Sequence, residues 1–299
     1  MKIFLIRRRY VAILAVLALV AGIFYVVTYP NSVSAAAATR QLPIYCVERD
    51  EKICSISFDA AWGNEDTQTL IDILAKYNVK TTFFVVGDWV DKYPESVKAL
   101  HDAGHEIMSH SNHHDHYNSL TGDQIVADVT ASNEKIAAVT GVTPTLIRCP
   151  YGEYDDHVIS AIRSMDMEPI QWDVDSLDWK DYDASTIYDR VTGKVTNGSI
   201  VLFHNAALHT PEALPSILET LIKNGYTIVP ISQLILDCEY TIDHTGRQCP
   251  AVAKDRACAT VFPRDSSAHN APQKVSPAAV VSTTGILMQS SQTISPLEI

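Results

Sequence analysis

Residues 53–86 read ICSISFDAAWGNEDTQTLIDILAKYNVKTTFFVV and contain two short apolar segments separated by an amphipathic one. Residues 53–58 and 81–86 are rich in β-branched and aromatic side chains, which is typical of buried strands. Residues 67–77 place apolar side chains three and four positions apart, which predicts a helix. A strand, a helix and a second strand in this order predict a unit with parallel strands.

The same alternation continues along the chain. Further strands are predicted at 106–109, 145–149, 168–172, 199–203 and 227–231, and further helices at 94–103, 121–140, 155–164, 184–195 and 211–224. About seven such units in under roughly 200 residues favour a compact barrel over an open sheet. We therefore predict an α/β fold, a distorted (β/α)7 barrel, over residues 45–236. No GxGxxG motif follows the first strand, which argues against a dinucleotide-binding fold.

Residues 1–29 predict a membrane anchor. Lys2 and the arginines at 7–9 precede a segment without charge from Tyr10 to Thr28. Its length is close to the roughly 20 residues of a spanning helix and exceeds the roughly 7 to 15 of a signal-peptide core. The basic end should stay in the cytoplasm, so we expect a single-pass cell-membrane protein whose barrel lies outside. The alternative is cleavage in the Ala-rich patch at 34–38, which would also export the barrel.

Two segments outside the predicted barrel are assigned from their composition. Residues 30–44 are rich in Ala, Ser and Thr and predict a spacer. Residues 237–299 contain three cysteines and end in a tail, 266–299, whose composition predicts disorder.

The net charge of −12 argues against nucleic acid as a partner, because affinity for nucleic acid comes largely from Lys and Arg. We expect a monomer.

Six cysteines suit an exported protein, but they lack the CxxC pairs of a zinc ribbon. Cys46 is close enough in sequence to Cys54, and Cys238 to Cys249, for each pair to form a disulfide. Cys149 is predicted to be a small buried apolar residue and not a nucleophile.

Ionisable side chains gather where five of the predicted strands end. In a β/α barrel, catalytic groups lie at these carboxyl ends and in the loops that follow them. In chain order the residues are Asp59, His110 and His114, Arg148, Asp175 and Asp178, and His204.

These segments resemble the five motifs of the carbohydrate esterase family 4 polysaccharide deacetylases, which share a NodB homology domain. The matching residues, within about 50–236, are Ser57-Phe58-Asp59, His110-Ser111-x-x-His114, Arg148-x-Pro150-Tyr151-Gly152, Asp175-x-x-Asp178-Trp179 and Leu202-x-His204. The resemblance implies a metal-dependent hydrolase that removes N-acetyl groups from a cell-wall glycan. Peptidoglycan is the expected substrate, and chitin-type oligomers are the alternative.

The resemblance also implies which residues bind the metal and move the protons. His110 and His114 would bind a divalent ion, zinc or cobalt, which polarises the amide carbonyl and activates water. Asp59 would be the general base, held ionised by Arg148. His204 would be the general acid that protonates the leaving amine.

Five further residues complete the implied site. Asp178 would orient His204, and Asp175 is the second candidate for that role. The backbone N–H of Tyr151 would stabilise the oxyanion. The acetyl group would be enclosed by side chains of Trp179 and Leu202.

One position departs from the family pattern. The family has a second aspartate, the third metal ligand, directly after the base, whereas Ala60 follows Asp59 here. The Trp62-Gly63 step resembles a subgroup of sporulation-associated wall deacetylases. We predict Asn64 as the replacement ligand, with Asp66 as the alternative, although this segment is equally suited to begin a helix.

Two other functions are consistent with the sequence. The missing aspartate motivates a catalytically silent glycan-binding or wall-assembly protein that has lost tight metal binding. An amidase acting on a non-carbohydrate substrate would use the same residues.

Overall fold

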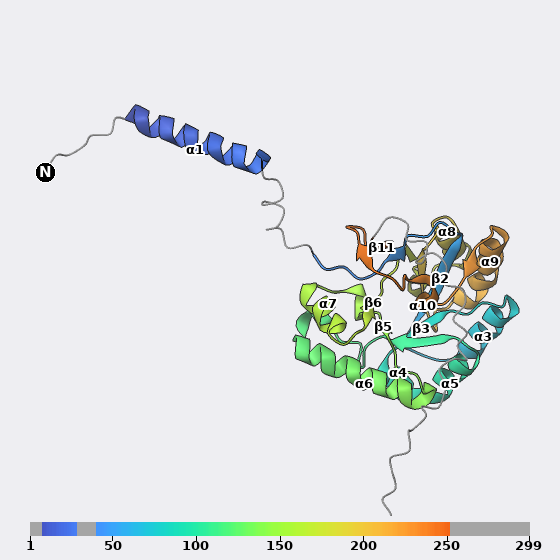
Figure 1. The fold of residues 1–299 in the computed structure, drawn as a ribbon. Coiled ribbons are helices and arrows are strands. Elements are labelled where there is room, and N and C mark those ends of the chain that lie inside the picture. The colour runs from blue at the N-terminus through green and yellow to red at the C-terminus, as the bar shows by residue number, and fades with distance from the viewer. Residues whose placement is uncertain (1–7, 29–39, 252–299) are drawn as a thin grey trace, which may run out of the picture. The chain divides into compact units, whose positions relative to one another are not determined.

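The computed structural model describes the backbone of residues 8–28 and 40–251 and the side chains of residues 13–25 and 40–251 (Figure 1). The predicted tail at 266–299 and most of the predicted spacer lie outside these residues. The predicted barrel lies within them.

Seven parallel strands and one additional short strand form the predicted α/β sheet (Figure 1). The order is β6-β5-β4-β3-β2-β8-β7, and β9 pairs with the beginning of β2. The bounds are β2 Ile53–Ala60, β3 Thr82–Val85, β4 Glu106–Ser109, β5 Leu146–Ile147, β6 Glu168–Pro169, β7 Val174–Asp175, β8 Ile200–His204 and β9 Thr227–Ile228. Within the described residues no strand pairing joins β6 to β7. The barrel is therefore distorted and open between these two strands.

Helices cover the outer face of the sheet (Figure 1). The bounds are α3 Thr67–Lys76, α4 Gly87–Lys92, α5 Pro94–Asp102, α6 Gly122–Thr140, α7 Asp156–Arg163, α8 Ala184–Thr192, α9 Thr210–Lys223 and α10 Ile231–Leu234. Single 3-10 turns lie at η1 Tyr117–Ser119, η2 Pro150–Gly152 and η3 Asp178–Lys180. The longest helix of the barrel, α6, begins with a reciprocal capping box between Thr121 and Gln124. Two short helices, α4 and α10, were not predicted, because one turn or two carry too little periodicity.

The pleat of β2 divides its side chains between the helices and the barrel interior. Phe58 stacks on Phe83 and Phe203 of the neighbouring strands, with ring centroids 4.8 and 5.6 Å apart, in the main hydrophobic core. Asp59 follows Phe58 and points to the opposite face, because successive strand residues alternate. Asp59 is in register with His204 of β8. The pleat therefore brings Asp59 and His204 to the same face at the same end of the barrel.

A small second sheet extends the domain beyond both predicted limits. β1 (Cys46–Val47) runs parallel to β11 (Arg247–Pro250), which pairs antiparallel with β10 (Tyr240–Ile242). Residues 44–46, at the beginning of β1 and directly before it, bridge the open side of the barrel, since Ile44 pairs with Ile170 after β6 and Cys46 pairs with Ser199 before β8. Ile44 is fully buried. The end of the predicted spacer and the described residues 237–251 therefore belong to the folded unit.

The cysteine pairs suggested by sequence distance are not formed. Cys46, Cys54 and Cys249 are free thiols, while Cys238 is disulfide-bonded. β1 and β2 belong to different sheets, so proximity in sequence does not bring Cys46 and Cys54 together. Cys149 is a buried member of a hydrophobic cluster, and burial raises the pKa of its thiol to about 12, as expected for an inert packing residue.

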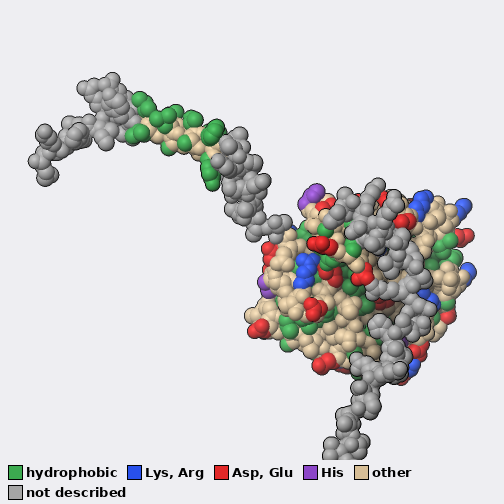
Figure 2. Space-filling view, in the orientation of Figure 1, with side chains coloured by type: hydrophobic (Ala, Val, Ile, Leu, Met, Phe, Trp, Pro, Cys, Tyr) green, Lys and Arg blue, Asp and Glu red, His purple; other side chains and the backbone are tan. Residues whose placement is uncertain are grey.

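The N-terminal helix α1 spans Arg8–Thr28, and its described side chains at 13–25 are exposed and mostly apolar (Figure 2). A search of the described residues identifies no helix with both the length and the apolar character needed to cross a membrane.

Candidate active site

Backbone strain is concentrated in the loops that follow β4, β5, β7 and β8. Eight non-glycine residues in the described part of the chain have positive φ. Six of these, with φ between 54° and 74°, lie in the four loops: Ser111, His114, Tyr151, Leu177, Asp181 and Ala206. Such conformations cost about 1–3 kcal/mol each and are typical of functional sites, where the surrounding structure enforces them.

Asp59, near the end of β2, is buried and paired with Arg148. Arg148 Nη1 donates to Asp59 Oδ1 at 2.7 Å, and Nη2 donates to Ser57 Oγ at 3.0 Å. The guanidinium carbon lies 4.3 Å from the centroid of the Phe84 ring, and Arg148 is fully buried. Burial alone would raise the pKa of Asp59, but the charge of Arg148 outweighs it and holds the pKa below its usual value. The carboxylate is therefore ionised at neutral pH.

The two predicted metal ligands lie side by side next to this carboxylate. The rings of His110 and His114 have centroids 5.0 Å apart. His110 Nδ1 donates to the backbone oxygen of Arg148 at 2.7 Å, which leaves the Nε2 lone pair 3.5 Å from Asp59 Oδ2. Burial lowers the pKa of His110, and burial together with the neighbouring His110 lowers the pKa of His114 to about 4.

This arrangement fits a divalent cation. Both imidazoles are neutral at neutral pH, which is the form that coordinates metals. The carbonyl that holds His110 Nδ1 is the usual outer partner of a metal-binding histidine. A lone pair and a carboxylate oxygen that face each other repel unless a proton or a cation lies between them.

The position of the family's third metal ligand is occupied by a residue that cannot bind a metal ion. Ala60 is fully buried in the main hydrophobic core and has no donor atom. Asn64 Nδ2 donates to Ser96 Oγ of α5 at 3.0 Å, so this amide contacts a helix, and its role as a metal ligand stays a prediction. Asp66, the alternative, accepts from the backbone N–H of Ala206 at 2.9 Å. Among the described side chains no group of three or more His, Cys, Asp or Glu is placed to hold a metal ion.

His204, the last residue of β8, is held by Asp178. The Nδ1 atom and the backbone N–H of His204 each donate to the Asp178 carboxylate at 2.8 Å, and Thr210 Oγ1 donates to it at 2.7 Å. Burial lowers the pKa of His204, but the hydrogen bond and charge of Asp178 outweigh burial and raise the pKa above its usual value. Asp175, the second candidate, accepts instead from the backbone N–H of Leu177 at 2.8 Å. The geometry therefore favours Asp178 as the orienting partner.

Exposed aromatic side chains lie beside these groups. Trp62, Tyr151 and Trp179 are 60%, 59% and 56% exposed. Trp62 and Tyr151 contact His114 from two directions, with ring centroids 5.4 and 4.5 Å from the imidazole. Leu202 is 3% exposed and lies two residues before His204 on β8, so both side chains share the interior face of the strand. Their predicted roles in substrate binding stay predictions.

Sequence reasoning missed two polar residues of the site. Thr210 lies directly before the predicted helix at 211–224 and was not predicted to belong to the site, yet it donates to the buried Asp178 carboxylate. Asn205 is 5% exposed and bonds to the loop that follows β2. Its position directly after His204 at a strand end was the same signal that identified the other residues.

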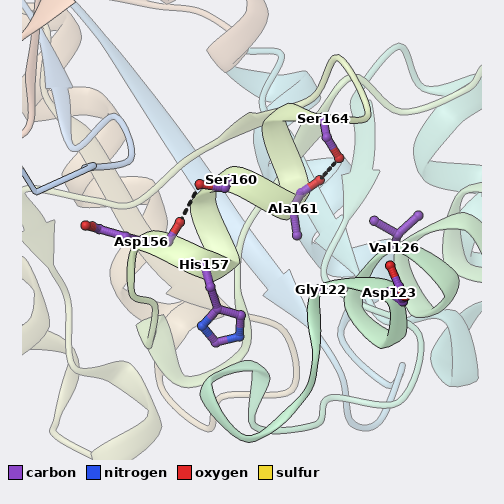
Figure 3. A pocket seen from close by; sticks show the side chains of 8 residues that line it. All are labelled: Gly122, Asp123, Val126, Asp156, His157, Ser160, Ala161 and Ser164. Carbon is purple, nitrogen blue, oxygen red and sulfur yellow. Dashed lines mark hydrogen bonds between the residues drawn. The ribbon is translucent and has the colours of Figure 1, made fainter.

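A hollow of about 510 Å³ lies away from these residues, between the N-terminal end of α6 and the length of α7 (Figure 3). It is lined by Gly122, Asp123, Val126, Asp156, His157, Ser160, Ala161 and Ser164. The hydroxyls of Ser160 and Ser164 donate to backbone oxygens of their own helix, so they are already satisfied (Figure 3). None of the predicted site residues lines this hollow.

The chain has detectable relatives across the barrel. A family model described as polysaccharide deacetylase matches residues 47–170. The peptidoglycan-N-acetylmuramic acid deacetylase PdaA of Bacillus subtilis is 31% identical over 199 residues, covering 65% of this chain and 76% of PdaA. PdaC of the same organism, which has the same activity in its name, is 33% identical over 188 residues, covering 63% of this chain and 40% of PdaC.

The fold is shared with solved structures of the same kind. The structure of a CE4 family pseudoenzyme from Bacillus anthracis has 33% sequence identity and a TM-score of 0.62, covering 64% of this chain and 68% of that one. The chain spans well under two thirds of PdaC, so likeness to the barrel does not carry over the activity of that whole protein. The match to PdaA covers three quarters of that relative. The chain therefore belongs to the polysaccharide deacetylase family.

Proposed function

We propose that this protein hydrolyses N-acetyl groups from amino sugars of a cell-wall polysaccharide, with peptidoglycan as the leading substrate, and releases acetate. The observation that carries the proposal is the placement of a carboxylate and an imidazole in register on adjacent strands, each held by a partner of opposite charge. Arg148 lowers the pKa of Asp59, which favours the ionised carboxylate, and Asp178 raises the pKa of His204, which favours the protonated imidazole. Amide hydrolysis needs such a base for the water and such an acid for the leaving amine. The names of PdaA and PdaC support the choice of substrate.

The proton transfers follow from this placement. Asp59 accepts a proton from water while the water oxygen bonds to the acetyl carbonyl carbon. His204 Nε2 donates a proton to the nitrogen while the carbon–nitrogen bond breaks, so acetate and a free amine leave. Exchange with solvent then removes the proton from Asp59 and returns one to His204. Arg148 and Asp178 act by fixing the charge and orientation of these two groups.

A divalent cation, zinc or cobalt, would be held by His110 and His114, with Asp59 Oδ2 alongside. When bound, such an ion polarises the acetyl carbonyl and lowers the pKa of water. The neutral imidazoles support this assignment, and Ala60 limits the number of protein ligands.

The test is acetate release by the purified protein from peptidoglycan and from chitin-type oligomers, with zinc or cobalt added. We expect mass spectrometry of the products to show the loss of acetyl groups. His204→Ala should slow the reaction by about 10²–10⁴-fold, as is typical for loss of a general acid. His101→Ala, in the last turn of α5 and away from the strand ends, is the matched control and should retain activity. Failure to release acetate from any amino-sugar polymer would reject the proposal.

A second candidate is a catalytically silent glycan-binding protein. Ala60 in place of the expected aspartate favours it, as does the likeness to a solved pseudoenzyme, of which a mutant is described as having restored activity. Metal stoichiometry separates the two candidates. The active enzyme should bind about one ion per chain, whereas the silent protein should bind much less and should bind glycan equally well after His204→Ala.

We also propose that the barrel is exported and anchored by the N-terminal segment. The basic residues before Tyr10 and the absence of charge from Tyr10 to Thr28 support this. Protease added to intact cells should digest the barrel. Protection of the barrel in intact cells, with digestion only after lysis, would contradict the proposal.

A further inference from the structure

We propose that Trp62 is a fixed stacking surface for a second sugar ring of the substrate, next to the one that is deacetylated, and that Asn205 is the positioning residue that holds it there. The inference rests on the proposed glycan substrate and adds a binding subsite to it. It follows from the way the loop after β2 is fastened.

Asn205 ties three consecutive residues of this loop to the end of β8. Its Oδ1 accepts from the backbone N–H of Ala61 at 3.2 Å, and its Nδ2 donates to the backbone oxygens of Trp62 and Gly63, the latter at 2.8 Å. The backbone N–H of Asn205 donates to the oxygen of Asp59 at 3.0 Å. Every polar atom of this 5% exposed side chain is therefore used to hold backbone.

Two more contacts fix the same loop. Trp89 Nε1 donates to the Gly63 oxygen at 2.6 Å. The Asp66 carboxylate accepts from the backbone N–H of Ala206. Gly63 has a φ of +46°, and a Cβ there would press on the side chain of Ala206, so the turn has room only for glycine. The loop is therefore held on both sides of Trp62.

The side chain of Trp62 is exposed to solvent. Its side chain is 60% exposed, although the backbone on either side is fixed. Its ring packs edge-on against His114, a predicted metal ligand, with centroids 5.4 Å apart. Tyr151 contacts His114 from another direction and stacks on His116, with centroids 4.1 Å apart. Trp62 thus continues a row of rings outward from the reacting groups.

These properties suit one face of a sugar ring. A pyranose has an apolar face of C–H groups and a polar edge, so it stacks on an exposed aromatic ring while its hydroxyls stay in water. A rigid loop lowers the entropy lost on binding, because the indole is already in position. Contact with His114 places this surface next to the acetyl group under attack. The ligand is therefore a glycan of several units and not a single amino sugar.

The test measures binding of a β-1,4-linked hexamer of N-acetylglucosamine to the full chain by calorimetry, in a His204→Ala background so that no turnover occurs. Trp62→Ala should weaken hexamer binding by about three- to tenfold, as expected for one aromatic contact, and Trp62→Phe should retain most of the affinity. Ile222→Ala, which truncates an exposed apolar side chain at the far end of α9, is the matched control and should bind like its parent.

A double-mutant cycle tests the positioning role. Asn205→Asp removes both donors at nearly the same size, and it should weaken hexamer binding by a similar factor. In a Trp62→Ala background the same change should add no further loss, because its effect acts through the indole. A purely structural role would weaken binding equally in both backgrounds and would overturn the positioning role.

The outcomes separate this inference from the proposed function. Hexamer binding that is unchanged by Trp62→Ala, while the parent chain without His204→Ala releases acetate, overturns the subsite alone. Binding that depends on Trp62 without any acetate release supports the subsite and rejects the deacetylase. Absence of hexamer binding by every form overturns the subsite, and the acetate assay then decides the activity by itself.

Discussion

Replacing Asp178 with asparagine should lower the pKa of His204 and move the pH dependence of the proposed reaction. The carboxylate is fully buried and accepts three hydrogen bonds, two of them from His204. In the native protein its charge outweighs the effect of burial and raises the pKa of His204. Asparagine keeps the shape but removes the charge, so burial then dominates and the imidazole loses its proton more easily.

The size of the effect can be worked from the contact. A hydrogen bond to a charged group is worth about 1.5–3 kcal/mol, and about 1.4 kcal/mol corresponds to one pKa unit. The pKa of His204 should therefore fall by about one to two units. A general acid acts only when protonated, so the alkaline limb of kcat/KM should move down by the same amount. Above the new pKa the rate should fall about 10- to 100-fold.

The assay is acetate release across pH 5–9, with Asp175→Asn as the comparison. The charge of Asp175 also raises the pKa of His204, but Asp175 bonds to a backbone N–H and not to His204, so its replacement should move the alkaline limb less than Asp178→Asn does. The native folded state gains stability from protonated His204 at low pH and loses it as pH rises through the raised pKa. Asp178→Asn should flatten that part of the stability curve. An alkaline limb that stays in place, or one that moves with Asp175→Asn instead, would refute the assignment of Asp178.

Three further changes test the energetics of the fold. Arg148→Met leaves the buried Asp59 carboxylate unpaired, so it should lower the free energy of unfolding in urea by about 3–5 kcal/mol near neutral pH. This loss of unfolding free energy should become smaller in acid, below the usual carboxyl pKa, since Asp59 stabilises the fold only when ionised. An equal loss at all pH values would contradict the ion pair. Thr121→Ala removes the capping box of α6 and should cost about 1 kcal/mol by the same measurement, whereas a loss near zero would show that the cap is not used. Gly198→Ala combines a φ of +78° with a clash against the Val47 oxygen and should lower the melting temperature by about 4 °C or more, while an unchanged value would show that the turn can relax.

Much of the barrel could be predicted because its sequence signals are local. Glu106–Ser109 is a strand with the predicted bounds, and α3, α5 and α9 begin or end within one residue of prediction. Asp59 and His204 were identified because polar residues at strand ends stand out against apolar strands. That both side chains lie at the same end of the barrel followed from the predicted fold class alone.

Other features depend on contacts between distant parts of the chain. The pairing of β1 with β11 joins residues about 200 positions apart, and no local sequence pattern predicts it. β7 has two residues, which is too short for alternation to register. The contact of Asn64 with α5 could not be predicted for a similar reason, since nothing near Asn64 in sequence indicates that its Nδ2 atom donates to Ser96.

The pairing of β1 with β11 also sets the order in which the barrel can be completed. The first strand of the domain, at Cys46–Val47, finds its partner only in the last described strand, at Arg247–Pro250. The N-terminal end of a chain is synthesised first, so β1 can pair with β11 only when almost the whole domain has been made. The strand that bridges the open side of the barrel therefore gains its last partner late in synthesis, and a chain truncated before residue 247 should lack the pairing of β1 with β11.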